Sequence, residues 1–280
     1  MYPVFSGIEL VYYDVHMQSC DINLAKGREM LIITHCQEGR IEFEYKNGEY
    51  LYLASGDFSI QKNTENIRHR YCPLSHYHGV SVAIDMNRVP RCFSCILDDV
   101  FVSPEELEMK FCSEKPYSIM RENISIEHIF SELYSVPENI RKGYHKVKVL
   151  ELLLFLSGLE YKGESEERRY FSRSQVTAAK EAKKYLLAHL DEHITITELA
   201  DMLGISSTSL KICFKGVYGN TINGYITNCK MQKAASLLKN TDKSVLEIAG
   251  IVGYNNGSKF ACAFRRVMNK SPNEYRKSLV

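Results

Sequence analysis

The sequence predicts a mixed fold, in which an all-β N-terminal domain and a few helices precede an all-α C-terminal domain with two helix-turn-helix units. Three observations lead to this prediction. The first ninety residues contain short runs rich in β-branched and aromatic side chains, apolar residues recur at helical spacing after Pro104, and 163–169 contains no apolar residue. The predicted domain at 1–162 is followed by a linker at 163–173 and a second domain at 174–280.

The composition is that of a globular protein of about two domains. Of the 280 residues 45% are hydrophobic and 25% charged, and the mean hydropathy is −0.24, which excludes disordered and fibrous classes. Nine irregularly spaced cysteines favour free thiols over a disulfide framework. No run approaches the roughly 20 apolar residues that span a bilayer, and residues 1–10 lack the features of a secretion signal. We expect a cytoplasmic protein with no structural disulfide, no cofactor and no membrane contact.

Six runs are predicted to form a small antiparallel barrel or sandwich. Turn-forming residues separate them, and we expect hairpin turns at 38–40, 47–48 and 55–57. Asn47-Gly48 favours a type I′ turn because both residues tolerate positive φ. The predicted strands are 10–15, 30–34, 41–45, 50–53, 57–60 and 79–84.

Two helices are predicted at about 124–133 and 147–156. The second is apolar almost all round, and a helix of this kind must be buried. It packs either on the β domain or against a second copy of the chain, and we expect a homodimer.

Charge is distributed unevenly along the chain. From residue 175 to residue 280 there are 15 Lys and Arg against 8 Asp and Glu, a net charge of +7, and the rest of the chain carries −6. A basic segment is a candidate for binding a polyanion, whereas the acidic part would repel DNA and needs another role. Chance imbalance is the alternative.

The segment at about 195–216 has the outline of a helix-turn-helix unit. Thr195 and Glu198 have the order of a capping box, Gly204 can end the helix in the left-handed conformation, and Ser206 can cap a second helix over 207–216. The residues expected to face inward are Leu199, Ala200, Met202 and Leu203 in the first helix and Leu210, Cys213 and Phe214 in the second.

The same arrangement recurs about fifty residues later, at about 244–268. Ser244 and Glu247 form the second predicted capping box, Gly253 the turn, and Asn256 the cap of a helix over 257–268. This internal repeat makes chance resemblance much less plausible for either copy. The inward-facing residues are expected to be Ile248, Ala249, Ile251, Val252, Phe260, Ala263 and Phe264.

A helical rod is predicted between the two units. Its 19 residues, 221–239, would be roughly 28 Å long at about 1.5 Å per residue. This length is close to one turn of B-DNA, about 34 Å, so that both second helices could enter successive major grooves.

A further pattern runs through the basic segment. It consists of Ile248-Ala249, Val252-Gly253-Tyr254, Ser258, Phe260, Phe264-Arg265-Arg266, Ser271-Pro272 and Tyr275-Arg276. This pattern resembles the signature of the AraC/XylS family of bacterial transcription regulators. The connecting helix is matched at Tyr225, Lys230-Met231, Ala234 and Leu237-Leu238, and the first unit at Ala200, Ser206, Leu210 and Phe214.

The resemblance covers about the last 105 residues and has implications for both ends of the chain. Several regulators of this family carry an N-terminal cupin-like barrel that binds an effector, and 50–58, with Leu53 and Gly56-Asp57, is similar to its usual strand and turn. The family implies no catalysis, and we find none of the phosphate-binding, nucleophile-elbow or zinc-protease motifs. We therefore do not expect an enzyme.

Helical geometry and the resemblance together suggest DNA contacts. Ile212 can offer only apolar contact, for example to a thymine methyl group, and Gly257 and Cys262 can distinguish bases only weakly, so DNA shape is expected to add specificity. The predicted base-facing residues are Thr208, Lys211, Ile212, Gly257, Ser258, Lys259 and Cys262. The residues predicted to contact phosphates are Lys215, Arg265, Arg266 and Lys270.

Two motifs leave metal or redox chemistry open. His76 and His78 would point to the same side of a strand, but the sequence lacks the Glu that metal-binding cupins usually add. Cys92 and Cys95 have the spacing of a zinc or redox site, with Cys112 further along, but a second pair is missing. We expect no metal, with strand-edge histidines or effector contacts as the alternative role.

These features predict a one-component transcription regulator that binds promoter DNA and an unknown small-molecule effector, with RNA polymerase as a partner if it activates transcription. The alternative is a regulator that responds to metal or thiol redox state through Cys92 and Cys95 or His76 and His78. A cupin-like enzyme would need converging carboxylates or histidines, which we do not find. The candidate effector-pocket residues, for which plain core packing is the other role, are Tyr12, Phe43, Tyr45, Tyr52 and Phe58.

Overall fold

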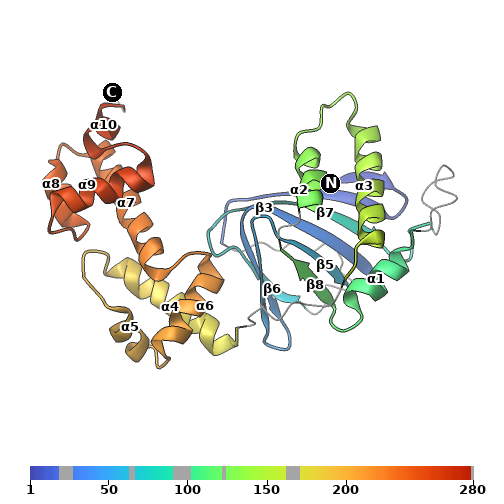
Figure 1. Ribbon diagram of the computed structural model, residues 1–280, viewed down its shortest axis with the longest axis horizontal. Coiled ribbons are helices and arrows are strands. Elements are labelled where there is room, and N and C mark those ends of the chain that lie inside the picture. Colours follow the sequence, from blue (N-terminus) through green and yellow to red (C-terminus); the bar gives the residue numbers. More distant parts are fainter. Residues whose placement is uncertain (19–27, 63–66, 91–101, 122–123, 162–170, 279–280) are drawn as a thin grey trace. The chain divides into compact units, whose positions relative to one another are not determined.

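The computed structural model describes residues 1–18, 28–62, 67–90, 102–121, 124–161 and 171–278. The chain divides into two compact units, Met1–Tyr170 and Phe171–Val280. The first is built on an antiparallel sheet and the second is helical (Figure 1), which confirms the predicted mixed fold class. The division between the units falls inside the segment 163–173 that we proposed as a linker.

The N-terminal unit contains an antiparallel sheet in which each predicted run overlaps an observed strand. The hydrogen-bonded order is β1-β2-β7-β3-β5-β8, and β4 and β6 pair with the second half of β3. The sequence did not indicate β1, β6 or β8, which are only four or five residues long. The strands are β1 Tyr2–Phe5, β2 Ile8–Val15, β3 Met30–Tyr45, β4 Tyr50–Ala54, β5 Phe58–Lys62, β6 Ile67–Tyr71, β7 Tyr77–Asp85 and β8 Tyr117–Met120.

The prediction of a hairpin turn at 38–40 was wrong. The two runs on either side belong to one strand, β3, which pairs with β5 and β7 up to Gly39 and with β4 and β6 from Arg40 onward. Gly39 has a φ of +84°, and a Cβ there would collide with the backbone of His76. The glycine therefore bends a continuous strand between two sets of partners instead of reversing the chain.

The turn between β3 and β4 is also of a different type from the one predicted. Gly48 has a φ of +85°, but Asn47 does not have positive φ. The prediction of a type I′ turn, which needs positive φ at both residues, was therefore wrong. The Tyr45 N–H donates to the Glu49 carbonyl at 2.9 Å and the Gly48 N–H to the Tyr45 carbonyl at 3.0 Å. This is a three-residue loop that needs only its glycine in the left-handed region.

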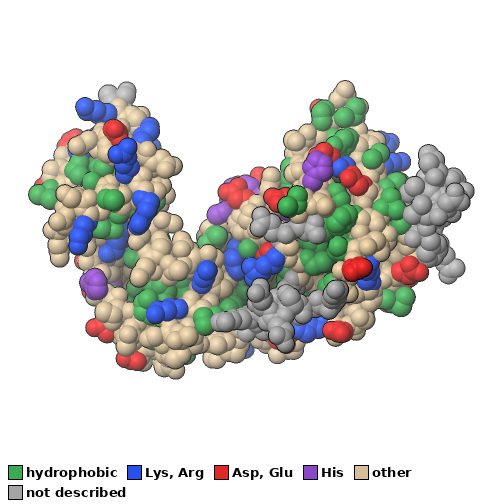
Figure 2. All heavy atoms as spheres, viewed as in Figure 1, with side chains coloured by type: hydrophobic (Ala, Val, Ile, Leu, Met, Phe, Trp, Pro, Cys, Tyr) green, Lys and Arg blue, Asp and Glu red, His purple; other side chains and the backbone are tan. Residues whose placement is uncertain are grey.

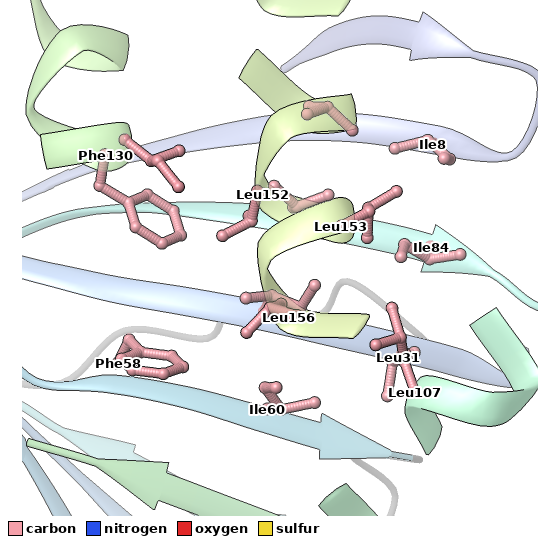
Figure 3. Close-up of a cluster of buried hydrophobic side chains, with 14 of the residues drawn as sticks. Ile8, Leu31, Phe58, Ile60, Ile84, Leu107, Phe130, Leu152, Leu153 and Leu156 are labelled. Atoms are coloured by element: carbon pink, nitrogen blue, oxygen red, sulfur yellow. The ribbon is translucent and has the colours of Figure 1, made fainter. Parts of the chain in front are cut away.

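Three helices pack on one face of the sheet: α1 Pro104–Cys112, α2 Ile124–Tyr134 and α3 Arg141–Gly158. Of these, α1 was not indicated by the sequence. Figure 3 shows Leu152, Leu153 and Leu156 of α3 lying over strand residues such as Ile84 and Phe58. All five side chains are at most 1% exposed, and burying each one contributes roughly 1.5–3 kcal/mol. The apolar α3 is thus buried against the sheet, as one of the two predicted alternatives requires.

The C-terminal unit consists of seven helices within the described residues 171–278. The segment 221–239 predicted as a rod corresponds to α7, which begins after its cap Thr221 and has 19 residues. The helices are α4 Arg173–Ala188, α5 Ile196–Met202, α6 Ser207–Tyr218, α7 Ile222–Asn240, α8 Val245–Ile251, α9 Gly257–Met268 and α10 Pro272–Lys277. Among the residues that the structure places, no helix is both long and apolar enough to cross a bilayer.

One predicted core residue of this unit is exposed. Met202 of α5 is 52% exposed, whereas Leu199 and Ala200 are 1% exposed. With 3.6 residues per turn, Leu199, Ala200 and Leu203 share one arc of this short helix, and Met202 falls beyond its edge. The prediction that Met202 faces inward was wrong for this reason.

Candidate nucleic-acid interface

The first helix-turn-helix unit has the capping geometry that its sequence predicts. The Thr195 Oγ1 accepts from the Glu198 N–H at 3.2 Å, and the Glu198 Oε2 accepts from the Thr195 N–H at 2.8 Å. The Thr195 N–H and the Thr195 hydroxyl, which donates to the same Oε2 at 2.7 Å, hold the pKa of the Glu198 carboxyl below its ordinary value. Gly204 follows with a φ of +65°, and the Ser206 side chain caps α6. The start and end of each helix in this unit are therefore set by local interactions.

The second unit repeats this geometry. Ser244 and Glu247 form the reciprocal pair, with contacts of 3.2 and 2.7 Å, and Gly253 has a φ of +77°. The Asn256 Oδ1 accepts from the Lys259 N–H at 2.9 Å and so caps α9. Both second helices, α6 and α9, are 12 residues long.

The connecting helix α7 contributes to the cores of both units. Toward its C-terminal end, Met231 and Leu238 are buried with Phe264 and other residues of the second unit. Near its N-terminal end, the Tyr225 ring lies 5.6 Å from the ring of Phe214 in the first unit, in a T-shaped arrangement. With 19 residues at about 1.5 Å each, α7 is roughly 28 Å long, so one stiff element is anchored in both units.

Two lysines reinforce these junctions. The Lys183 Nζ of α4 lies 4.9 Å from the ring centre of Tyr218 in α6 and 5.7 Å from that of Tyr225 in α7. The Lys230 Nζ of α7 lies 5.7 Å from the ring centre of Tyr254, just after α8. Burial lowers the pKa of both lysines. These cation–π contacts tie α7 to its neighbours on both sides.

The residues predicted to meet DNA lie on α6 and α9 or directly after α9, and all are accessible to solvent. Ile212 and Gly257 are half-buried and the other residues are exposed. Among the described residues, none of their lysines and arginines has a carboxylate within ion-pairing distance, since the ion pairs there all involve other side chains. Their charges thus remain available to a polyanion. Their division into base-facing and phosphate-facing groups stays a prediction.

Basic side chains are spread over the visible surface of the C-terminal helices, as Figure 2 shows. This agrees with the net charge of +7 between residues 175 and 280. A positive surface attracts the phosphate backbone at long range and does so less strongly as salt increases.

The predicted effector-pocket residues do not lie together. Phe58 belongs to the core between the sheet and the helices, and Phe43 and Tyr45 are buried in a separate cluster. The Tyr52 hydroxyl donates to the Glu42 Oε2 at 2.6 Å. Of the five residues, Tyr12 lines a pocket in the described part of the chain.

That pocket lies between the first two strands and the helices α2 and α3, on the helix-covered side of the sheet. Its volume is about 210 Å³, and it is lined by Tyr2, Tyr12, Leu133, Tyr134, Val136, Arg141 and His145. The pocket forms only where distant segments meet, so that sequence reasoning could not assemble it. The available signal was the presence of an aromatic residue in each of two successive N-terminal strands, Tyr2 in β1 and Tyr12 in β2.

Burial disfavours the charged forms of Tyr12 and His145 in this pocket. It raises the pKa of Tyr12 to about 12 and lowers the pKa of His145. The Tyr12 hydroxyl donates to the Leu133 carbonyl at 2.8 Å and lies 3.2 Å from the His145 Nε2. Arg141, whose guanidinium lies 5.7 Å from the Tyr2 ring centre, contributes a positive charge to the lining.

The metal and thiol candidates separate into two cases. Cys92 and Cys95 lie outside the described residues. His76 and His78 lie near Asp14, His16 and Glu38 at one end of the sheet. The sequence analysis did not include these three neighbours, although Asp14 and His16 have the same two-residue spacing as the histidine pair.

Two capped helix-turn-helix units on one connecting helix define the C-terminal unit as a double helix-turn-helix domain. The profile of the protein family described as "Helix-turn-helix domain" matches residues 199–278. Over 153 residues the chain is 31% identical to the xylose operon regulatory protein of Escherichia coli strain K12, which covers 51% of this chain and 39% of that protein.

Other relatives match shorter stretches of the chain. The melibiose operon regulatory protein of the same E. coli strain is 30% identical over 93 residues, 33% of this chain and 31% of that protein. A putative AraC-like transcription regulator of Streptomyces lividans is 34% identical over 83 residues, 30% of this chain and 27% of that protein. This chain is thus similar to AraC-like regulators, and the matches span about two fifths or less of the length of these relatives.

Among solved structures, the C-terminal domain of AraT, a response regulator from Geobacillus stearothermophilus, is 32% identical to this chain. The match covers 36% of this chain and 84% of that domain, with a TM-score of 0.35.

Proposed function

We propose that this protein is a sequence-specific, non-enzymatic transcription regulator whose two helix-turn-helix units contact successive major grooves of promoter DNA. The observation that carries the proposal is the pair of exposed, N-capped helices α6 and α9, both held by α7. A rod of roughly 28 Å is compatible with the spacing of successive grooves, about 34 Å.

Within this proposal the exposed side chains have two kinds of role. Lys211 and Lys259 on the outer faces of α6 and α9 would contact base edges, and Thr208, Ile212, Gly257, Ser258 and Cys262 would line the same grooves. Lys215, Arg265, Arg266 and Lys270 would contact phosphates, which position the protein without specifying sequence.

The test begins with selection of bound sites from a pool of random DNA duplexes, followed by gel-shift titration of a selected and a scrambled site at two salt concentrations. Lys211→Ala should weaken binding to the selected site by about 1–3 kcal/mol and leave the scrambled site nearly unchanged. Lys270→Ala should weaken both sites alike and reduce the slope of log affinity against log salt by about 1.

Lys46 provides the matched control. It is an exposed lysine in the turn between β3 and β4 of the N-terminal unit, and Lys46→Ala should leave both affinities unchanged. If neither Lys211→Ala nor Lys270→Ala changed DNA affinity, the proposed orientation of α6 and α9 would be wrong.

The same proposal includes control by a small organic anion bound in the pocket of the N-terminal unit. Arg141 provides a guanidinium that suits a carboxylate, and Tyr2 and Tyr12 provide aromatic walls beside it. The carboxylate that pairs with Arg141, that of Glu138, lies 3.9 Å away and is 91% exposed. A ligand anion would therefore compete with a weak ion pair.

Thermal unfolding of the full chain with benzoate and with cyclohexanol tests this part. Benzoate should raise the melting temperature and cyclohexanol should not, and Arg141→Gln should abolish the effect of benzoate. Lys142→Gln, at the exposed neighbouring position, is the control and should retain it. Equal responses of the two variants would contradict an Arg141 anion site.

Homodimerisation through the outer surface of α3 is the last part of the proposal, and RNA polymerase is the further partner if the protein activates transcription. Val147 on α3 is 62% exposed, although its neighbour Val149 is completely buried. Val147→Glu should shift sedimentation equilibrium toward the monomer, with Lys46→Glu as the control. A wild-type chain that remains monomeric at all concentrations would contradict the dimer.

A further inference from the structure

Five potential metal ligands lie at one end of the N-terminal sheet. Asp14 of β2 is directly paired with His78 of β7, and Glu38 of β3 is paired with the same histidine from the other side. Directly paired residues in antiparallel strands share a face, and so do residues two apart along a strand. His16 directly follows β2 and His76 directly precedes β7, and each extends the cluster by its contact with a carboxylate of this row, Asp14 and Glu38 respectively.

Three of these side chains are close enough to share one ion. The Asp14 Oδ1 lies 2.8 Å from the His16 Nε2 and 3.1 Å from the His78 Nε2. One ligand atom from each of the three lies within 4.8 Å of the others. Tetrahedral Zn²⁺ with ligands at about 2.0–2.2 Å places neighbouring ligand atoms about 3.4 Å apart. The three atoms therefore need only small side-chain movements to surround an ion.

The Nε2 of His78, the atom that would bind an ion, has no hydrogen-bond partner. The atom is shielded from solvent, and it makes no hydrogen bond although the Asp14 Oδ1 is 3.1 Å away. The contact thus has the distance of a hydrogen bond without its geometry. An imidazole nitrogen that makes no hydrogen bond, next to a carboxylate oxygen, belongs to the donor set that a transition-metal ion uses.

Glu38 faces the second ring nitrogen of His78 at ion-pairing distance, on the side where metal-binding histidines usually have a carboxylate. Its Oε2 lies 3.7 Å from the Nδ1 of His78, on the side of the ring opposite to Asp14, and its Oε1 lies 3.9 Å from the Nε2 of His76. A carboxylate facing the second nitrogen of a ligand histidine fixes the orientation and tautomer of the ring. Glu38 is therefore a positioning residue for His78, and its charge also favours a cation nearby.

We propose that Asp14, His16 and His78 form a binding site for a divalent transition-metal ion such as Zn²⁺, with water completing the coordination. Imidazole nitrogens suit Zn²⁺, Ni²⁺ and Cu²⁺, whereas Mg²⁺ and Ca²⁺ take oxygen ligands. The Asp14 and His16 side chains are 77% and 68% exposed, so the site is open and the ion exchangeable. In Figure 2, histidine and acidic side chains are neighbours on the visible surface of the N-terminal unit.

The experiment is a titration of the purified, metal-free full chain with Zn²⁺ by calorimetry, and with Co²⁺ as a probe whose visible absorption reports nitrogen and oxygen ligation. One ion should bind per chain, and a large excess of Mg²⁺ should not displace it. His78→Gln should weaken Zn²⁺ binding by at least about 100-fold, and Glu38→Gln by about 10–100-fold.

His128 gives a matched control. It is an exposed histidine, 69% accessible, with the Glu132 carboxylate 3.6 Å away on the same helix. Within the described part of the chain, this pair belongs to no cluster of three potential metal ligands. His128→Gln should bind Zn²⁺ as the wild type does. Melting temperatures of the metal-free variants confirm that each one is folded.

Two results would overturn the proposal: no binding of Zn²⁺ or Co²⁺ by the wild type, or equal affinity in the wild type and His78→Gln. Neither result depends on DNA. The metal site and the proposed regulator function can therefore fail separately.

Discussion

The two helix-turn-helix units have the same local construction. Each begins with a reciprocal capping box, turns at a left-handed glycine and continues into a 12-residue helix with a side-chain cap. The second helix ends in both cases at a left-handed residue, Gly219 in the first unit and Asn269 in the second. Because these devices act within a few residues of each other, each unit forms its own framework.

The units differ in the element that covers them. In the first unit, α4 packs along α6, and the half-buried Gly216 faces the ring of Phe171 so closely that a Cβ would overlap it. In the second unit the corresponding position on α9 is Arg266, which is exposed. There α10 provides the cover: the ring of Tyr275 lies 5.5 Å from that of Phe264.

This difference distinguishes the features that both helix-turn-helix units share from the features that vary between them. Caps, turn glycines and inward phenylalanines recur in both copies, whereas the covering helix and the residues that meet it do not. Equivalent substitutions at the repeated positions should therefore change the stability of the two helix-turn-helix units by similar amounts. Substitutions at the positions that meet the covering helix should change it by different amounts. The following predictions test this comparison, beginning with the largest effect.

Truncation of the equivalent buried phenylalanines should be the most damaging change. Phe214 and Phe264 are both completely buried, and replacing a buried phenylalanine by alanine costs about 3–5 kcal/mol. Urea unfolding followed by far-ultraviolet circular dichroism should give similar losses for Phe214→Ala and Phe264→Ala. A loss below about 1 kcal/mol in one of them would show that the two cores are not equivalent.

Replacing the two turn glycines by alanine should cost different amounts of stability, although both glycines have the same left-handed conformation. A Cβ at Gly204 would meet no atom within 4 Å, so Gly204→Ala should cost only the left-handed penalty of about 1–2 kcal/mol. At Gly253 a Cβ would lie 2.5 Å from the Asp191 carbonyl oxygen, in the segment after α4. Gly253→Ala should therefore cost about 1–3 kcal/mol more in urea unfolding.

The same contact gives Gly253 a second role. Because Asp191 precedes the first unit and Gly253 lies in the second, the close approach helps to fix the two units relative to each other. Gly253→Ala should weaken DNA binding even under conditions where it is fully folded, and Gly204→Ala should do so less. Equal stability and equal DNA affinity of the two variants would remove this distinction.

These two glycines also show how far sequence reasoning reaches. The left-handed turn follows from a glycine between two capped helices, and the sequence predicts it at both positions. The approach of Asp191 to Gly253 involves residues more than sixty positions apart and has no local signal. The N-terminal unit shows the same division: the glycine at 39 was noticed, but its role in bending β3 depends on the partners β4, β5, β6 and β7.

The candidate sites show the same contrast between features set by local sequence and features set by contacts between distant segments. The capped helices that carry the predicted DNA contacts came from local motifs, and the structure places those side chains at accessible positions. The pocket around Arg141 and the cluster around His78 bring together distant segments, and their full sets of residues follow only from strand pairing and helix packing.

A third prediction concerns the residue that α4 covers. Gly216→Ala would displace Phe171, whose burial contributes about 1.5–3 kcal/mol, and would regain about 1 kcal/mol of helix propensity. The expected net loss is about 0.5–2 kcal/mol in urea unfolding. Arg266→Ala, at the corresponding position of the second unit, should stay within about 0.5 kcal/mol of the wild type.

A double-mutant cycle gives this prediction its control. In a Phe171→Ala background the ring is absent, so that Gly216→Ala should become neutral or stabilising. If Gly216→Ala lost as much stability in that background as in the wild type, its destabilising effect would not come from the contact with Phe171.

The smallest effect should come from the feature that both units share, the capping boxes. Hydrogen bonds from the backbone and side chain of the N-cap residue hold the pKa of Glu198 and of Glu247 below the ordinary value of 4.5. A lowered pKa in the folded state means that the unfolded chain binds protons more readily. The contribution to stability is therefore complete above pH 4.5 and is lost as the pH falls through the lowered values.

Replacing both carboxylates by amides isolates this effect. Gln accepts the same hydrogen bond without titrating, so the Glu198→Gln, Glu247→Gln double variant should lose less stability than the wild type between pH 6 and pH 3, measured by urea unfolding at each pH. The two single variants should each remove a similar part of the dependence, because the boxes have the same geometry. An unchanged dependence in the double variant would place acid sensitivity elsewhere, and unequal single variants would show that the repeat is not energetically symmetric even at its most similar positions.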